Sequence, residues 1–309
     1  MDVAYVVCPS YHGATLLALL LNNHSQISAL GDTIPLRKWD PVCACGRRAS
    51  ECDFWQTVST SLDTSRFSGL PTLLPAMPWP LSQHQVEAGV VRLSRSAPLN
   101  RLAGQAAGQL ADLATPPVWR LRKRSVADFV GTYRSFYQLV LDMHGTSTFV
   151  DGFKSWRKVA LLARELQPAS RVRIIHLVRD PRGFVASRRR HAHAEDLRES
   201  AWLWADLHHR MELVRESAPY RLLKYEDLCA QPEIEMRALF RFLDVEPESV
   251  ISAPKYPHKH HILGNQMLRT FSGSVALDER WRAELSPAEQ RTVLGCAGEM
   301  ADRLGYEFD

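Results

Sequence analysis

The first twenty-one residues contain the feature that most restricts the fold. Residues 3–8 (Val-Ala-Tyr-Val-Val-Cys) are apolar on both faces, which is typical of a buried parallel strand. A short loop over residues 9–13 leads into residues 14–21, which are apolar all round apart from Thr15, so the helix they form should be buried too. A buried strand joined by a short loop to a buried helix predicts an α/β fold with a parallel sheet covered on both faces.

The same alternation continues along the chain. Further strands are expected at residues 27–30, 148–151, 171–178 and 220–224, and helices at 126–143, 157–166, 181–188, 195–217 and 233–242, before a tail of loop and helix from residue 254. This order predicts a three-layer single domain, residues 1–309, around a central parallel sheet. The Pro- and Leu-rich stretch at about 60–145 is interpreted as an inserted helical cap.

Composition and charge exclude several classes of protein. The formal net charge of +4 suits an anionic ligand and does not demand nucleic acid. The longest apolar stretch, residues 14–21, is far shorter than the roughly 18–20 residues that span a bilayer. The segment before it carries Asp2 and no Lys or Arg, unlike a secretory signal. We therefore expect a cytoplasmic protein with no membrane span and no nucleic-acid partner; a homodimer is left open.

The loop after the first strand is a candidate anion site. Amide groups at the start of a helix, with a glycine that permits close approach, bind phosphate well. The candidate ligands are Ser10, Tyr11, His12, Gly13, Ala14, Thr15 and Leu16. No Lys follows Gly13, which argues against the G-x-x-x-x-G-K-[ST] loop of ATP- and GTP-hydrolysing proteins. On its form alone, an ordinary strand-to-helix turn is an equal alternative.

Two later segments carry polar groups to the same edge of the predicted sheet, where ligands of such sheets bind. Arg179 ends the clearest strand, and Ser187 follows eight residues later on the predicted helix. A guanidinium with a nearby hydroxyl can clamp a phosphate dianion; the alternative is that Arg179 pairs with Asp180. The segment 225–228 (Tyr-Glu-Asp-Leu) follows another strand, and its alternative interpretation is a plain connection to the next helix.

Together these segments resemble the PAPS-dependent sulfotransferases of bacterial type, where PAPS is 3′-phosphoadenosine 5′-phosphosulfate. Residues 11–17 correspond to the family loop R-S-G-[ST]-T-L-L for the 5′-phosphosulfate, Arg179 and Ser187 to its 3′-phosphate pair, and Tyr225 to its Y-E-D-L segment. The tail, similar over residues 261–269, adds Gly264, Asn265 and Arg269 to the nucleotide candidates. The likeness covers about residues 3–45 and 148–306. It implies a P-loop-like strand–loop–helix, PAPS as donor with PAP as product, and in-line transfer to a hydroxyl or amine of a small-molecule acceptor.

The loop departs from the family pattern at two positions. Tyr11 stands where relatives usually carry a cation, and His12 where they carry serine. The His12 ring is a candidate proton or hydrogen-bond donor, with the equal alternative that only its backbone amide matters. Lys154 is the candidate for the missing charge, unless it pairs with Asp151. Asp32 is the candidate base for the acceptor proton, with the alternative that it caps the next segment.

Other functions and a metal remain as alternatives. The two departures also fit a non-catalytic nucleotide-binding module, and a P-loop kinase is disfavoured by the loop. No metal is expected for the reaction. Most of the six cysteines should be reduced thiols. Cys43, Cys45 and Cys52 are expected to have a local structural role, although they could pair or hold zinc with a fourth ligand. His258, His260 and His261 are expected to be solvated or near the nucleotide.

Overall fold

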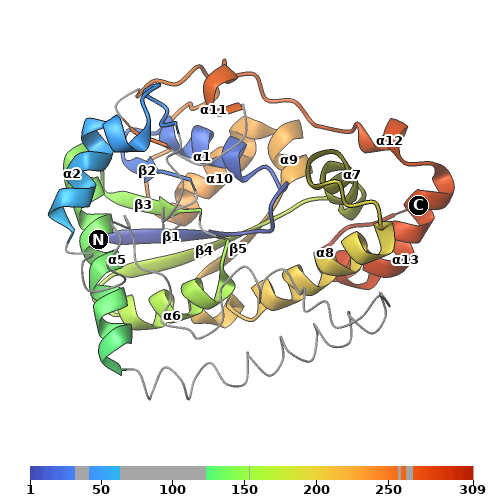
Figure 1. The fold of residues 1–309 in the computed structure, drawn as a ribbon, viewed down its shortest axis with the longest axis horizontal. Helices are drawn as coiled ribbons and strands as arrows, with labels where there is room; N and C mark the ends of the chain where they lie inside the picture. Colours follow the sequence, from blue (N-terminus) through green and yellow to red (C-terminus); the bar gives the residue numbers. More distant parts are fainter. Residues whose placement is uncertain (32–41, 63–122, 153, 257–258, 262–266, 309) are drawn as a thin grey trace.

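A computed structural model describes residues 1–31, 42–62, 123–152, 154–256, 259–261 and 267–308. Its centre is a sheet of parallel strands (Figure 1): β1 (Asp2–Val7), β2 (Ile27–Ala29), β3 (Thr148–Asp151), β4 (Arg171–Val178) and β5 (Tyr220–Lys224). Their order is β2-β3-β1-β4-β5, with Asp2 opposite both Thr148 and Arg171. The connection from β3 to β4 passes over β1, so the carboxyl end of β1 lies at a topological switch point, where such sheets bind ligands.

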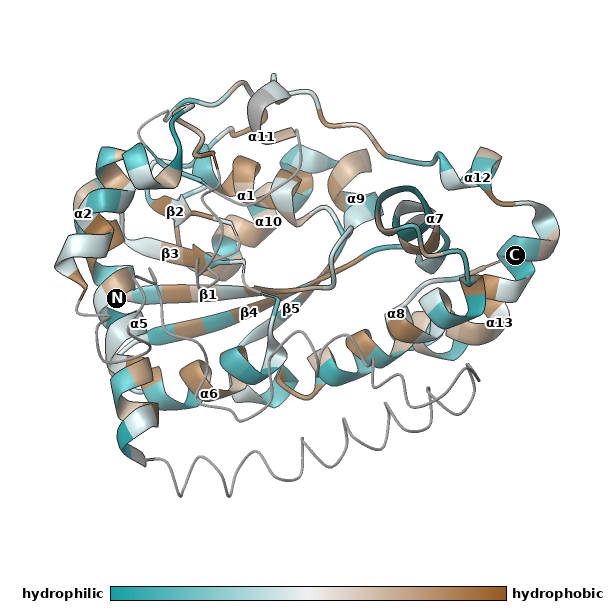
Figure 2. Cartoon of the chain, in the orientation of Figure 1, coloured by the Kyte–Doolittle hydropathy of each residue, from teal (hydrophilic) through white to brown (hydrophobic). Residues whose placement is uncertain are grey.

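Alternate residues of the strands face two apolar cores. Val3, Tyr5 and Val7 of β1 belong to one core, and Ala4 and Val6 to the other. The first core is covered by α2 (Asp53–Ser61), α5 (Lys123–His144) and α6 (Trp156–Leu166), and the second by α1 (Ala14–Asn22), α9 (Tyr225–Ala230) and α10 (Pro232–Leu243). The predicted three-layer α/β fold is confirmed, and its central strands and α1 are dominated by apolar residues (Figure 2).

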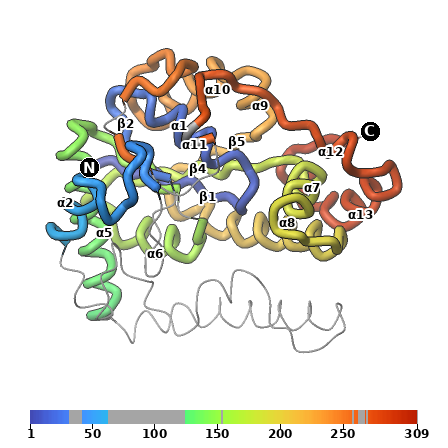
Figure 3. Tube along the Cα trace, turned by 45° about the horizontal axis from the view of Figure 1, so that its top comes forward, coloured from blue at the N-terminus to red at the C-terminus, as the bar shows by residue number. Residues whose placement is uncertain are grey.

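A third group of helices closes the carboxyl end of the sheet. Here α7 (Pro181–Ala192), α8 (Leu197–Glu212) and α13 (Pro287–Arg303) pack around the buried side chains of Phe184 and Trp204. The tail reaches them from α11 (Met267–Thr270) by way of α12 (Trp281–Glu284), across the edge of the molecule (Figure 3). Within the described ranges, no helix combines the length and apolarity needed to cross a membrane.

The structure changes the predicted elements in a few places. The helix expected over residues 195–217 ends at Glu212, and a separate 3-10 helix follows at Arg215–Ser217. The helix from Pro181 continues to Ala192, beyond its predicted end. Helix α9 begins at Tyr225 directly after β5, and α2, with the short 3-10 helix Ala49–Glu51 before it, was not expected.

Most of the predicted cap, residues 63–122, lies outside the described residues. Its last part is α5, whose Phe129, Tyr133, Phe136 and Tyr137 are buried in the first core with Tyr5 and Phe149. The end of the predicted insertion therefore forms part of the layer that covers the sheet.

Candidate functional site

The loop between β1 and α1 is held in a conformation that requires glycine at one position. Gly13 has φ of 85°, in the left-handed region that favours glycine. A Cβ added there would come within 2.5 Å of Cδ2 of the Tyr225 ring. Only glycine therefore fits between α1 and Tyr225, and the first-turn amide groups of α1, which have no acceptor within the helix, begin directly beside it.

A hollow of about 420 Å³, part of it open to solvent, lies at the carboxyl ends of β1, β2 and β3. Its lining includes Ala14, Thr15, Gly31, Gly152, Lys154 and His261. The backbones of Gly31 and Gly152 are joined by an N–H···O bond of 3.1 Å, and a Cβ on Gly152 would lie 3.0 Å from the Gly31 oxygen. The structure thus brings Lys154 into the same hollow as the start of α1. Asp32 follows Gly31 in sequence but lies outside the described residues.

Arg179 connects the loop, α7 and the tail. Its Nη1 donates to the Tyr11 carbonyl at 2.9 Å and to Ser187 Oγ at 3.3 Å. Its guanidinium lies 4.6 Å from the centre of the Tyr225 ring, and its side chain is 7% exposed. Ser187 also accepts from Arg190 Nη2 at 3.1 Å. The predicted pair of Arg179 and Ser187 is thus formed, with a second arginine beside it.

The Asp278 carboxylate occupies this basic group in the structure. Arg179 Nη2 donates to Asp278 Oδ2 at 3.2 Å, and Arg190 Nη2 lies 3.6 Å from the same oxygen. Hydrogen bonds from Arg280, followed by the bond and charge of Arg179, hold the pKa of Asp278 well below its usual value. The arrangement therefore accepts an oxyanion.

Asp180 pairs with Arg182, and not with its neighbour Arg179 as the alternative interpretation proposed. Asp180 caps α7 by accepting from the Arg182 backbone at 2.7 Å, and it also pairs with the Arg182 side chain. Its own N–H donates to Glu226 of α9 at 2.9 Å. Asp180 therefore fixes where α7 begins relative to β4 and α9, which leaves Arg179 directed toward the loop and the tail.

His12 lies at the end of a buried chain of hydrogen bonds. Its Nδ1 is 2.9 Å from the Ser10 carbonyl and its Nε2 is 2.9 Å from His208 Nε2. His208 Nδ1 is 2.8 Å from His176 Nε2, and His176 Nδ1 bonds the Tyr220 hydroxyl. The carbonyl can only accept, so His12 carries its proton on Nδ1; His208 and His176 then donate from Nε2, and Tyr220 donates to His176.

This chain is complete only when all three histidines are neutral. Burial lowers the pKa of His12 to about 3 and that of His176 to about 3, and it lowers the pKa of His208 well below the ordinary value. Both ring nitrogens of His12 are used inside the protein. The ring therefore holds the loop to α8, and His12 has only its backbone left for a ligand.

The other predicted ligands have mixed placements. Ser10 is exposed and lies at the turn of the loop, while Leu16 is buried in the second core. The Tyr11 ring stacks on His191 of α7, with ring centres 6.0 Å apart. Gly264 and Asn265 lie outside the described residues, and Arg269 belongs to α11 with its side chain not described.

Sequence reasoning missed several residues of this region. Arg190 and Asp278 were not among the predicted ligands, because neither belongs to a local motif. His208 and His176 lie 196 and 164 positions from His12, so nothing in the spacing joins them. His261, which was expected to be solvated or near the nucleotide, is buried and lines the hollow.

The sequence is similar to a known family and to known proteins. The model described as "Sulfotransferase family" matches residues 12–249. Human carbohydrate sulfotransferase 6 is 28% identical over 169 residues, which are 45% of this chain and 42% of that protein. Mouse carbohydrate sulfotransferase 1 is 25% identical over 170 residues, 46% of this chain and 40% of that protein. The chain spans about two fifths of the length of these curated relatives.

A solved structure shares the fold. The sulfotransferase domain from the Synechococcus PCC 7002 olefin synthase superposes with a TM-score of 0.53 at 16% identity, covering 100% of this chain and 96% of that chain. At this identity the likeness shows the common architecture and says nothing about the acceptor.

Proposed function

Because the chain belongs to the sulfotransferase family, we propose that it transfers a sulfuryl group from PAPS to a hydroxyl or amine of a small-molecule acceptor. The observation that carries the proposal is the group formed by Arg179, Ser187 and the loop at Gly13. Arg179 bonds both Ser187 and the Tyr11 carbonyl, and it stacks on the ring that covers Gly13. One side chain therefore links a candidate 3′-phosphate site to a candidate 5′-phosphosulfate loop.

The residues present suit the 3′-phosphate of the donor. Arg179 and Arg190 supply N–H groups and Ser187 a hydroxyl, which is a strong set for a dianion. The Asp278 carboxylate already lies against both arginines. A phosphate bound there would compete with Asp278, and Arg280, which donates to Asp278 Oδ1 at 2.7 Å, can keep that carboxylate paired when it moves aside.

The other end of the donor would meet the loop and the hollow. PAPS supplies the activated sulfuryl group, and the protein must orient it and stabilise the charge that develops on the leaving phosphate. The first amides of α1, the Thr15 hydroxyl and the Lys154 ammonium are grouped for this task. We assign His12 the positioning of the loop, because both of its ring nitrogens are bound inside the protein.

Asp32 remains our candidate for the base that takes the acceptor proton. Its chain neighbour Gly31 lines the same hollow as Thr15 and Lys154. The variant Asp32→Asn should abolish turnover and leave PAP binding nearly intact. Full turnover in this variant would remove Asp32 from the mechanism without affecting the assignment of the donor site.

Donor binding is tested by thermal stabilisation. We expect PAP to raise the melting temperature and ATP, which lacks a 3′-phosphate, to raise it much less. The variant Arg179→Lys keeps the charge and loses the two-pronged geometry, so it should weaken PAP binding by about 10-fold or more. Arg189→Lys is the matched control, because Arg189 pairs with Glu289. Equal stabilisation by ATP and PAP would contradict the donor assignment.

Transfer itself is tested by an acceptor screen with PAPS, followed by mass spectrometry for the gain of about 80 Da that one sulfo group adds. Sugars with free hydroxyls are the first acceptors to test, because the curated relatives are named as carbohydrate sulfotransferases. PAP binding without transfer to any acceptor, and without slow hydrolysis of PAPS, would favour a nucleotide-binding module instead.

A further inference from the structure

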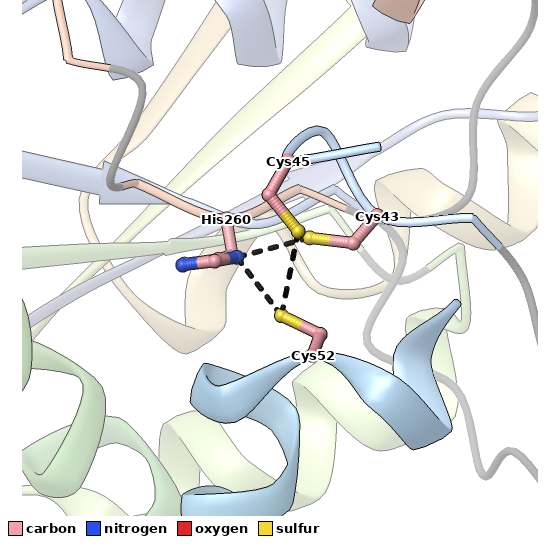
Figure 4. Close-up of side chains that lie close together, drawn as sticks. All are labelled: Cys43, Cys45, Cys52 and His260. Atoms are coloured by element: carbon pink, nitrogen blue, oxygen red, sulfur yellow. Dashed lines mark hydrogen bonds between the residues drawn. The ribbon is translucent and has the colours of Figure 1, made fainter. Parts of the chain in front are cut away.

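Four side chains with sulfur and nitrogen ligand atoms converge beside the hollow (Figure 4). They are the thiols of Cys43, Cys45 and Cys52 and the imidazole of His260, and one ligand atom from each lies within 4.8 Å of all the others. The contacts between them include Cys43 Sγ to His260 Nδ1 at 3.0 Å, Cys52 Sγ to the same nitrogen at 3.2 Å, and Cys45 Sγ to Cys52 Sγ at 3.6 Å.

The local backbone is shaped to present these thiols together. Val42 and Arg48 form an antiparallel bridge, and between them the chain turns tightly, with Cys43 N–H donating to Arg47 O at 2.8 Å. The turn uses Gly46 at φ of 88°, where nothing lies within 4 Å of an added Cβ, so its backbone alone demands glycine. Cys52 comes from the junction between the 3-10 helix and α2.

The histidine is brought to the thiols by a different part of the chain. Ala44 N–H donates to the His261 carbonyl at 2.9 Å, which joins the cysteine turn to the segment that follows α10. The His260 ring lies flat on Phe54 of α2, with ring centres 4.5 Å apart and an interplanar angle of 9°. This stack fixes the plane of the imidazole while its Nδ1 faces the thiols.

From this geometry we propose that Cys43, Cys45, Cys52 and His260 form a structural zinc site. Zinc in such sites is tetrahedral, with bonds of about 2.3 Å to sulfur and about 2.0 Å to nitrogen. A tetrahedron with those bonds separates two sulfurs by about 3.8 Å and a sulfur from a nitrogen by about 3.5 Å. The separations of 3.6, 3.0 and 3.2 Å need only small shifts to match.

Two other fates of the thiols are less consistent with the arrangement. A disulfide requires sulfurs about 2.05 Å apart and uses two cysteines, which leaves the third thiol and the oriented imidazole without a purpose. Plain packing does not require three thiols and a ring nitrogen to point at one centre. Four protein ligands complete the tetrahedron, so the metal would have no open position and would act on structure rather than in the reaction.

The site would tie two segments to the wall of the candidate donor pocket. Binding zinc fixes the turn at 43–47 and the start of α2 against His260, and the next residue, His261, lines the hollow. The metal would therefore hold one side of the pocket in place. This inference stands on the four ligands alone and does not depend on the proposed transfer reaction.

The test is the zinc content of the full chain purified under reducing conditions, measured by elemental analysis. We expect about one zinc per chain for a site of this type. Cys45→Ser removes an exposed ligand with little loss of packing and should weaken zinc binding by at least about 100-fold, since changes in residues around a metal already cost 10–100-fold. Cys296→Ser, at a cysteine on α13 outside the cluster, is the matched control and should keep its zinc.

Two further measurements identify the ligands. His260→Cys should retain the metal as a four-cysteine site, whereas His260→Ala should lose it. Cobalt bound in place of zinc should show thiolate-to-metal charge-transfer absorption that Cys45→Ser weakens and Cys296→Ser leaves unchanged. The proposal is overturned if the reduced wild-type chain takes up no zinc or cobalt, if mass spectrometry finds two of these cysteines joined under reducing conditions, or if His260→Ala keeps full zinc content.

Discussion

The chain of His12, His208 and His176 should make the protein sensitive to mild acid. All three rings are neutral in the folded state, with the pKa of His12 and of His176 lowered to about 3 by burial and that of His208 also lowered well below its ordinary value. In the unfolded chain each ring titrates near the ordinary histidine pKa of about 6.5. As the pH falls through that value, the unfolded state binds protons that the folded state does not bind. The free energy of unfolding therefore decreases from near neutral pH downward, until the pH reaches the folded-state pKa.

The size of the effect follows from the unfolded-state titration. A histidine that stays neutral when folded lowers the free energy of unfolding by about 1.4 kcal/mol between about pH 7.5 and about pH 5.5. Three such groups give about 4 kcal/mol, a large part of the roughly 5–15 kcal/mol that stabilises a typical domain. The order of donors along these hydrogen bonds helps to keep the folded rings neutral, because a protonated ring would place two donors face to face.

The variant His208→Gln isolates this contribution. A glutamine amide offers one donor and one acceptor but does not titrate, so the loss of stability over the same pH interval should shrink by about 1.4 kcal/mol. His209→Gln is the control, since His209 is the exposed next residue of α8 and the same substitution there leaves the buried histidines in place. Urea unfolding at each pH, followed by tryptophan fluorescence, gives the comparison, and carboxylate contributions cancel between the variants.

The reasoning is refuted if His208→Gln and His209→Gln lose the same stability on acidification. It is also refuted if nitrogen chemical shifts show any of the three buried rings to be protonated in the folded protein at about pH 5.5, well above the folded values that burial implies. The same spectra test the tautomers, because His12 should carry its proton on Nδ1 while His208 and His176 carry theirs on Nε2.

Three further changes test the candidate donor site. Gly13→Ala should lower the free energy of unfolding by about 1–3 kcal/mol more than Gly145→Ala, because both alanines take a left-handed conformation but only the first meets the Tyr225 ring. Urea unfolding measures the difference, and equal losses in the two variants would contradict the close contact. Asp278→Asn removes the carboxylate that competes for the arginines and should tighten PAP binding about fivefold, the equivalent of about 1 kcal/mol. Calorimetry measures the affinity for PAP, and weaker binding would show that Asp278 assists the ligand instead. Lys154→Met should lower turnover by at least about 100-fold, because the loss of one group that stabilises developing charge has an effect of this size, and the affinity for PAP should change far less. Steady-state rates and a PAP titration measure the two effects, and unchanged turnover would exclude Lys154 from the reaction.

The strands were predictable because their chemistry is local. Residues 171–178 and 148–151 alternate between two apolar cores, and their predicted bounds are those of β4 and β3. The start of α7 was also legible, since Pro181 occupies its first turn after the cap at Asp180. Helix α9 was not expected because six residues provide little helical signal, and its Tyr225 is placed by contact with Gly13 and Arg179.

Contacts between distant segments could not be predicted from the sequence, and the reason is physical. Cys43 and His260 lie 217 positions apart and meet only because the cysteine turn pairs with the backbone of His261. The pairing of Arg179 with Asp278, 99 positions away, likewise depends on the path of the tail. Local spacing reports which side chains share an element, whereas these sites join residues whose elements are brought together by the packing of the whole sheet.

The two departures of the loop from the family pattern have a common structural consequence. Tyr11 has φ of 68°, a conformation that is costly for a residue other than glycine, and it is stabilised from several directions. Its ring stacks on His191, its carbonyl accepts from Arg179, and the next residue, His12, is bonded to His208. The His12 ring is buried and the Tyr11 ring packs against α7, so the loop would present backbone amides that are already ordered before an anion arrives. A preorganised loop needs no reorganisation when charge develops, so in the proposed reaction its amides and Lys154 would stand in for the cation that this loop lacks.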